Sequence, residues 1–115
     1  MRRSDERAGY RHARLQEILL EEIRAWLRDE AADPALQAVR ITSLSLSVDY
    51  RHARVHFSVC DPGPEDPTRR KEVETALSRA THPLRAQLAI DLDLKRTPDL
   101  RFVFDGFAVD PEVLP

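Results

Sequence analysis

The chain has 115 residues, of which 42% are hydrophobic and 33% are charged, and its formal net charge is −2. This length suits one domain, and the high charged fraction fits a compact core beneath a heavily solvated surface. A lone cysteine, Cys60, excludes an internal disulfide, and neither a membrane span nor a signal-peptide core is visible, so we expect a cytoplasmic protein without membrane contact.

The first expected element is an amphipathic helix over residues 11–30. Apolar side chains such as Leu15, Leu19 and Ile23 recur there at three- and four-residue spacing. Asp33-Pro34 ends the pattern, because a proline ring cannot continue the helical hydrogen-bond ladder. Residues 1–10 are rich in arginine, and we expect them to form a flexible basic arm.

Two strands are expected next, over residues 39–49 and 53–59. Leucine and valine alternate with serine from Ser43 to Val48, which indicates a half-buried strand. Val39 and Ile41 lie in the opposite phase, which indicates either a bulge or a start of the strand that is buried on both faces. The connection over residues 49–52 is short, so the two strands should pair as a hairpin.

A helical unit follows a proline-rich loop over residues 61–67. Val73, Leu77, Leu84 and Leu88 mark its apolar face. Thr81-His82-Pro83 interrupts this unit, because a proline pushes its predecessor towards extended geometry, so the pattern predicts a helix, a kink and a second helix. Alternation over residues 100–104 predicts a third strand that ends at Asp105-Gly106 and is followed by a short tail, residues 106–115.

The predicted order is therefore α-β-β-α-kink-α-β within one domain, residues 11–105. A hairpin is antiparallel, so a third strand in the same sheet must run parallel to one of its strands. We predict an α+β fold with a three-stranded mixed sheet and helices packed on one of its faces.

This order is that of a type II KH domain, an RNA-binding fold, and specific residues resemble one family with that fold. The run Ile41–Ser58 is similar, without a gap, to the hairpin of ribosome-binding factor A. Asp33-Pro34 matches an Asp-Pro after that family's first helix, and Pro98-Asp99-Leu100-Arg101-Phe102 resembles its second signature. Several weak motifs in the correct order make a specific signal, covering roughly residues 11–105.

The resemblance implies a bacterial assembly factor for the small ribosomal subunit. Such a protein binds the free 30S subunit or its precursor, contacts 16S rRNA, and assists late maturation and 5′-end processing, particularly in the cold. The chain departs from the family pattern at three positions: His82 replaces the usual kink glycine, Val48 a turn proline and Lys95 a common arginine. A monomer is the default state.

The predicted RNA contacts are basic or polar residues near the kink, before the third strand, at the start of the second helical unit and in the arm. Helix N-termini and cationic side chains attract phosphate, whereas the same residues can equally be solvated surface positions. The predicted set is Arg79, Thr81, His82, Arg85, Lys95, Arg96, Arg69, Arg70, Lys71, Arg3, Arg7 and Arg11.

The sequence shows no catalytic constellation, so we predict a binding protein and not an enzyme. His52 and His56 are four residues apart on a strand, about 13 Å, which is too far to share one metal ion. No glycine-rich phosphate loop is present, and neither a cofactor nor a metal is expected. The net negative charge keeps a second hypothesis open, a protein-binding adaptor on the same scaffold without direct RNA contact.

Overall fold

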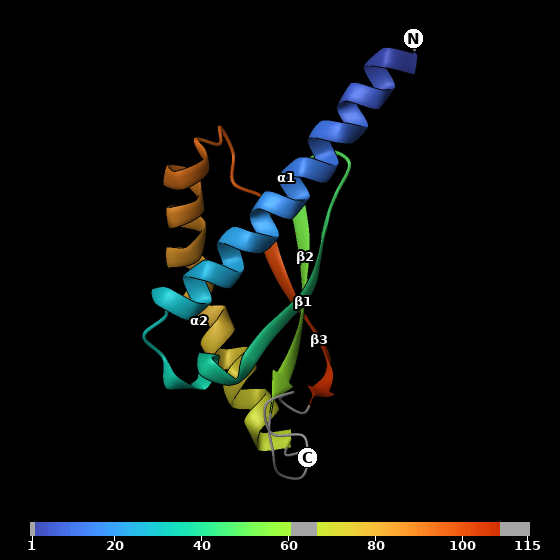
Figure 1. Ribbon diagram of the computed structural model, residues 1–115. Coiled ribbons are helices and arrows are strands. Elements are labelled where there is room, and N and C mark those ends of the chain that lie inside the picture. The colour runs from blue at the N-terminus through green and yellow to red at the C-terminus, as the bar shows by residue number, and fades with distance from the viewer. Residues whose placement is uncertain (1, 61–66, 109–115) are drawn as a thin grey trace.

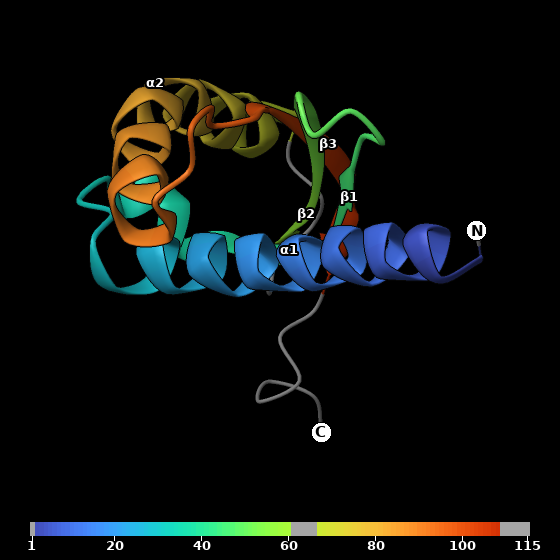
Figure 2. The same ribbon diagram turned by 90° about the horizontal axis from the view of Figure 1, so that it is seen from above.

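The computed structural model describes residues 2–60 and 67–108, with the side chains of residues 9–60 and 67–107. Its elements are α1 (Arg2–Asp29), the 3-10 helix η1 (Pro34–Ala38), β1 (Val39–Leu46), β2 (His52–Cys60), α2 (Pro67–Leu92) and β3 (Asp99–Ala108). Both helices lie on the same side of the sheet, and Figure 2 shows α1, α2 and the sheet as three sides around the core. The predicted α+β class and single-sided helical layer are confirmed.

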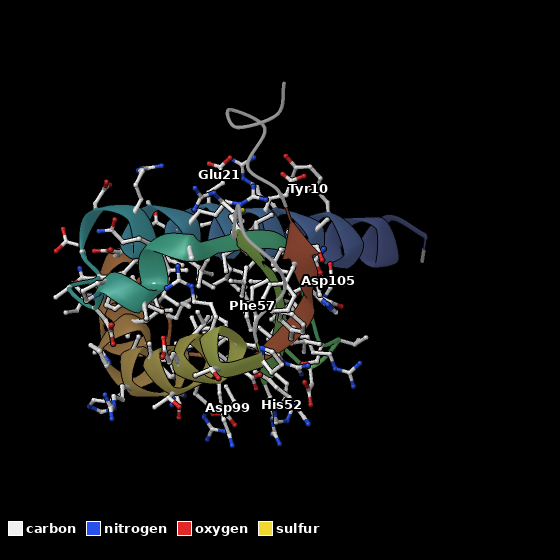
Figure 3. All side chains as sticks on the ribbon, turned by 90° about the horizontal axis from the view of Figure 1, so that it is seen from below. Tyr10, Glu21, His52, Phe57, Asp99 and Asp105 are labelled. Carbon is white, nitrogen blue, oxygen red and sulfur yellow. The ribbon has the colours of Figure 1, made fainter. Side chains whose placement is uncertain are left out.

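The sheet has the order β1-β2-β3, with β2 in the centre. β1 pairs with β2 antiparallel and β3 pairs with β2 parallel, so the predicted mixed sheet is confirmed. Of the two alternatives for the start of β1, the bulge is present, because the register shifts between Ile41 and Ser43. Four apolar side chains of β2 are fully buried: Ala53, Val55, Phe57 and Val59. Figure 3 shows Phe57 in the space between the two helices.

Two predicted boundaries differ from the structure. α1 begins at Arg2, so residue 10 is not a boundary of secondary structure, and α1 extends beyond the sheet (Figure 1). β3 continues through Asp105-Gly106 to Ala108, because a backbone irregularity there restores pairing of Phe107 with Val59. Gly106 has a φ of +103°, which only glycine adopts without strain. Most of the predicted tail, residues 109–115, lies outside the described ranges.

The predicted helix, kink and second helix form one helix, α2, that contains Pro83. Its buried side chains, Val73, Ala76, Leu77, Ala80, Leu84 and Leu88, continue on both sides of this proline. Figure 1 shows that the helix bends between its two halves. Packing of one uninterrupted apolar face against the core explains why the chain stays helical through the proline.

Side chains of α1 bind the open edge of β1. The Oε1 atom of Gln16 accepts a hydrogen bond from the Leu46 N–H at 2.9 Å, and Arg24 donates to the Ile41 carbonyl from Nε at 3.1 Å and Nη2 at 2.7 Å. His12 Nε2 lies 2.7 Å from the Leu46 carbonyl oxygen. An open edge strand exposes unpaired backbone groups, so these contacts satisfy part of that edge.

Candidate functional site

The bend in α2 has a local chemical cause. Pro83 lacks the N–H that a helical residue would donate to the carbonyl four residues earlier, that of Arg79. Two residues before the proline, the Thr81 hydroxyl donates to the Leu77 carbonyl at 2.8 Å. A hydroxyl that bonds back in this way tends to bend a helix further. The bend is therefore encoded within residues 77–83.

This bend presents two of the predicted RNA contacts to solvent. Arg79 and His82 are both exposed, whereas Ala80 and Leu84 between and beyond them are buried. Thr81 is half-buried and its hydroxyl is used within the helix, which leaves it a smaller part in any external contact. The outer surface of the bend thus combines a guanidinium and an imidazole.

Arg85 does not point freely into solvent. It donates from Nε to the Pro98 carbonyl at 3.1 Å and from Nη2 to the Thr97 carbonyl at 2.9 Å. Its Nη2 also lies 3.3 Å from Asp99 Oδ1, and 36% of its side chain is exposed. Arg85 therefore fixes the connection between α2 and β3, and most of its donors are already occupied.

Lys95 and Arg96 are exposed on that same connection. The connection starts at Asp93, which has a φ of +49° just after the last residue of α2, a common way to end a helix. Because Arg85 holds the carbonyls of residues 97 and 98, the position of the two cations depends on it. The structure thus places Arg85, Lys95 and Arg96 in one region.

The first half of α2 holds the other predicted cations. Lys71 and Arg79 line an open groove of about 490 Å³ between α2 and the start of η1, together with the carboxylates of Asp33 and Glu72. Arg70 pairs with Glu74 at 2.6 Å (Nε to Oε1). Its guanidinium also lies 4.1 Å from the centre of the Phe104 ring. Lys71 and Arg79 are therefore better placed for an external partner than Arg70 is.

The twelve predicted residues do not form one cluster. A helix of 26 residues is up to about 39 Å long, so the cations at the start of α2 lie far from Lys95 and Arg96 beyond its end. Arg69 is half-buried near the start of α2. Arg11 is exposed on α1, and the side chains of Arg3 and Arg7 lie outside the described residues. The surface resembles an extended interface more than a pocket.

Other side chains restrict what the molecule can do. Among the side chains that the structure describes, no group of three or more His, Cys, Asp or Glu residues could hold a metal ion. None of the described helices is long and apolar enough to cross a membrane. Sequence reasoning missed Arg54 and Arg101, two exposed arginines at paired positions on β2 and β3. The one sequence signal that could have identified them was their alternation with apolar residues, which places them on the outward face of the sheet.

Comparison with known proteins places these features in context. The family model described as ribosome-binding factor A matches residues 11–110. Ribosome-binding factor A of Heliobacterium modesticaldum is 40% identical over 98 residues, which cover 85% of this chain and 78% of that protein. The corresponding protein of Vesicomyosocius okutanii is 36% identical over 101 residues, which cover 88% and 83%.

Solved structures of the same family have a similar fold. The crystal structure of ribosome-binding factor A from Thermus thermophilus superposes with a TM-score of 0.56 at 28% identity, covering 83% of this chain and 92% of that one. A model of the Thermus thermophilus protein fitted into the electron-microscopy map of a 30S complex gives a TM-score of 0.51 at 32% identity, covering 80% and 88%.

Proposed function

This chain belongs to the ribosome-binding factor A family, and on that premise we propose that it binds the small ribosomal subunit through the subunit's RNA. The observation that carries the RNA contact is the exposed bend of α2, where Arg79 and His82 face solvent. Support for the partner comes from the Thermus thermophilus relative, which was fitted into a 30S complex. The role proposed for this surface is binding without catalysis, in keeping with the family's description as a ribosome-binding factor.

The finer role that we propose is assistance in late maturation, including processing of the 5′ end of 16S rRNA, with greatest need in the cold. The mechanism is steric: a rigid domain holds an immature RNA arrangement and leaves as the subunit is completed. Backbone and shape contacts dominate such recognition of structured RNA. The protein would do this in the cytoplasm, as a monomer on a type II KH-like scaffold.

The proposed contact residues are exposed basic or imidazole side chains: Arg79, His82, Lys71, Lys95 and Arg96, with Arg11 on α1. Arg85 has a positioning role, because its guanidinium holds the backbone that carries Lys95 and Arg96. Arg70 is already bound to Glu74 and Phe104, so it contributes to the field around the site more than to a direct contact.

Sedimentation of the full chain with purified ribosomal particles tests the proposal. The protein should co-migrate with the small subunit, mature or immature, and not with the large subunit, and the affinity should fall with salt. An Arg79→Glu variant should bind more weakly and with a smaller salt dependence, while Arg28→Glu at the end of α1 serves as the charge-matched control. Absence of co-migration with either small subunit would refute the proposal.

A protein-binding adaptor is the competing hypothesis, and the net charge of −2 is the observation that favours it. Such an adaptor would bind a protein component of the same particle. Its affinity would then be insensitive to the reversal of charge at Arg79, and removal of the ribosomal RNA by nuclease would leave the partner bound.

A further inference from the structure

The face of the sheet turned away from the helices carries its own rows of polar side chains. Residues that pair across neighbouring strands share a face. Arg54 on β2 pairs with Ser45 on β1 and with Arg101 on β3, and all three are exposed. In the next row, His56 pairs with exposed Ser43. Buried residues alternate with these along β2, which confirms that the rows face outward.

The pairing of Arg54 with Arg101 is unfavourable for the isolated domain. Neighbouring strands lie about 4.8 Å apart, and like charges placed directly opposite destabilise a sheet. Neither guanidinium makes an ion pair or hydrogen bond with the residues whose side chains the structure describes. The carboxylate of Asp99, two residues before Arg101, is already 3.3 Å from Arg85 Nη2 and 3.8 Å from His52 Nδ1. Two adjacent cations thus remain available to an external anion.

The chemistry of this face suits phosphate groups. A guanidinium presents a planar fork of donors that matches phosphate, and the exposed hydroxyls of Ser43 and Ser45 add neutral donors beside it. Among the described outward positions no phenylalanine, tyrosine or tryptophan occurs, so the face offers no platform on which bases could stack. Contact with a nucleic-acid backbone therefore fits better than readout of bases.

We propose that the outward face of β2 and β3 binds phosphates of a second RNA segment, with Arg54 and Arg101 as the contact residues. The bend of α2 lies on the helical side of the sheet, so the domain would bridge two RNA segments on its opposite sides (Figure 2). This inference rests on the proposed function, since both segments belong to the small subunit. It adds a surface that the helical contact does not contain.

The double variant Arg54→Gln/Arg101→Gln and its two single variants, made in the full chain, test the surface. Each single change should weaken binding to the small subunit about tenfold, because one charge-assisted contact is lost. Each should also lower the slope of log affinity against log salt by about 0.7 to 0.9. Arg28→Gln, which removes an exposed guanidinium from the end of α1, should change neither quantity.

A stability measurement separates loss of contact from loss of fold. Removing one arginine of a like-charged pair should leave the midpoint of urea unfolding unchanged or raise it. Weaker binding together with equal or greater stability supports the proposal. If the double variant binds with the affinity and salt slope of the wild type, the proposed second surface is refuted. The proposed function is unaffected by that result as long as the wild-type chain binds the small subunit.

A crosslink identifies the class of the partner. Ser45→Cys in a Cys60→Ala background places one photoactivatable probe beside Arg54 on the outward face. With the subunit bound, the probe should crosslink to ribosomal RNA. A crosslink to a ribosomal protein would overturn this inference but not the proposed function. The same holds if the chain binds the subunit and no crosslink forms. A wild-type chain that binds no small subunit would overturn the proposed function and this inference together.

Discussion

Thr42 on β1 donates a hydrogen bond from its hydroxyl to Asp105 Oδ2 on β3 at 3.1 Å, across the central strand β2. Both residues lie where strand register is irregular. The β1–β2 register shifts between Ile41 and Ser43, and the β2–β3 register shifts between Phe57 and Val59, opposite Asp105 and Gly106. One side-chain contact thus fastens two bulges to each other, and these bulges set the curvature of the sheet.

Replacing Thr42 with valine removes this hydrogen bond and keeps the shape of the side chain. The free energy of unfolding should fall by about 0.5–1.5 kcal/mol in urea denaturation. Asp105→Asn retains an acceptor oxygen and should cost less. Equal stability of Thr42→Val and the wild type, with an unchanged m-value, would show that the bulges hold their geometry without the contact.

The edge of β1 offers a second test. Gln16→Leu should leave the Leu46 N–H without its side-chain acceptor in a partly buried position, at a cost of about 1–2 kcal/mol. Hydrogen exchange should accelerate at the Leu46 amide relative to its neighbours. Glu17→Leu, one residue along α1 and exposed, is the matched control. If the Leu46 amide stayed protected, the edge would have to be shielded by another group.

Arg79 and Arg85 should respond differently to the same change. Arg85→Gln should destabilise the fold by about 1–3 kcal/mol, because two backbone carbonyls and Asp99 lose a charged partner. Arg79→Gln should leave stability within about 0.5 kcal/mol, since its side chain is exposed, yet weaken binding to the small subunit. Thermal unfolding and sedimentation of both variants measure the two effects, and a reversed order would contradict this division of roles.

Asp49 predicts a pH dependence for the β1–β2 turn. Hydrogen bonds from the Ser47 hydroxyl and the Arg51 N–H lower the pKa of Asp49 below its ordinary value of 3.8. The pKa of Asp49 is lower in the folded chain than in the unfolded chain. Ionised Asp49 therefore contributes stability that is fully present at pH values above its pKa in the unfolded chain. That stability is lost as pH falls through the folded pKa.

The measurement compares the wild type with Asp49→Asn in urea at several pH values. The wild type should be the more stable at neutral pH, and the difference should shrink below about pH 4. Glu30→Gln removes an exposed carboxyl just after α1 and is the control for the loss of one negative charge elsewhere on the surface. A difference that is constant with pH would mean that the turn does not depend on the charge of Asp49.

His82 stands where the family resemblance led us to expect glycine, and the structure predicts the cost of introducing glycine there. His82 is an exposed position inside α2, so the His82→Gly variant should be less stable than the His82→Ala variant by about 0.5–1 kcal/mol, because glycine loses more backbone entropy in a helix. The His82→Ala variant should be at least as stable as the wild type, because alanine has the higher helix propensity. Both variants lack the imidazole. If both bind the small subunit more weakly than the wild type, the imidazole contributes to binding; if both bind equally well, it does not.

Much of the fold could be predicted from periodicity, and the misses have definite causes. Alternation identified β1 and β2, because one face of each strand is buried. The proline rule predicted a kink at Pro83 between two helices. The structure has a bend there, but it lies within the single helix α2, because the buried face continues from Val73 to Leu88. Similarly, Gly106 continues β3 through a bulge at the position where the strand was expected to end.

Less of the candidate site was predictable, because residues distant in sequence determine which of its side chains are free to contact a partner. Arg85 looked equivalent to Arg79 in the sequence, and only the folded chain brings it to the carbonyls of Thr97 and Pro98. The alignment of Arg54 with Arg101 depends on strand register, which no local pattern supplies.

The parallel pairing of β2 with β3 has a consequence for synthesis of the chain. α1, β1 and β2 make contacts that are close in sequence, whereas β2 meets β3 only after α2 has been made. At 5–20 residues per second, residues 61–98 take about 2–8 s to translate, during which one edge of β2 has no partner strand. Contacts of such high sequence separation also form slowly. The nascent chain therefore passes through a stage in which Val55, Phe57 and Val59 lie on an unpaired edge strand. Arg54 before Val55 and His56 after it are polar interruptions of the kind that limit aggregation of such an edge.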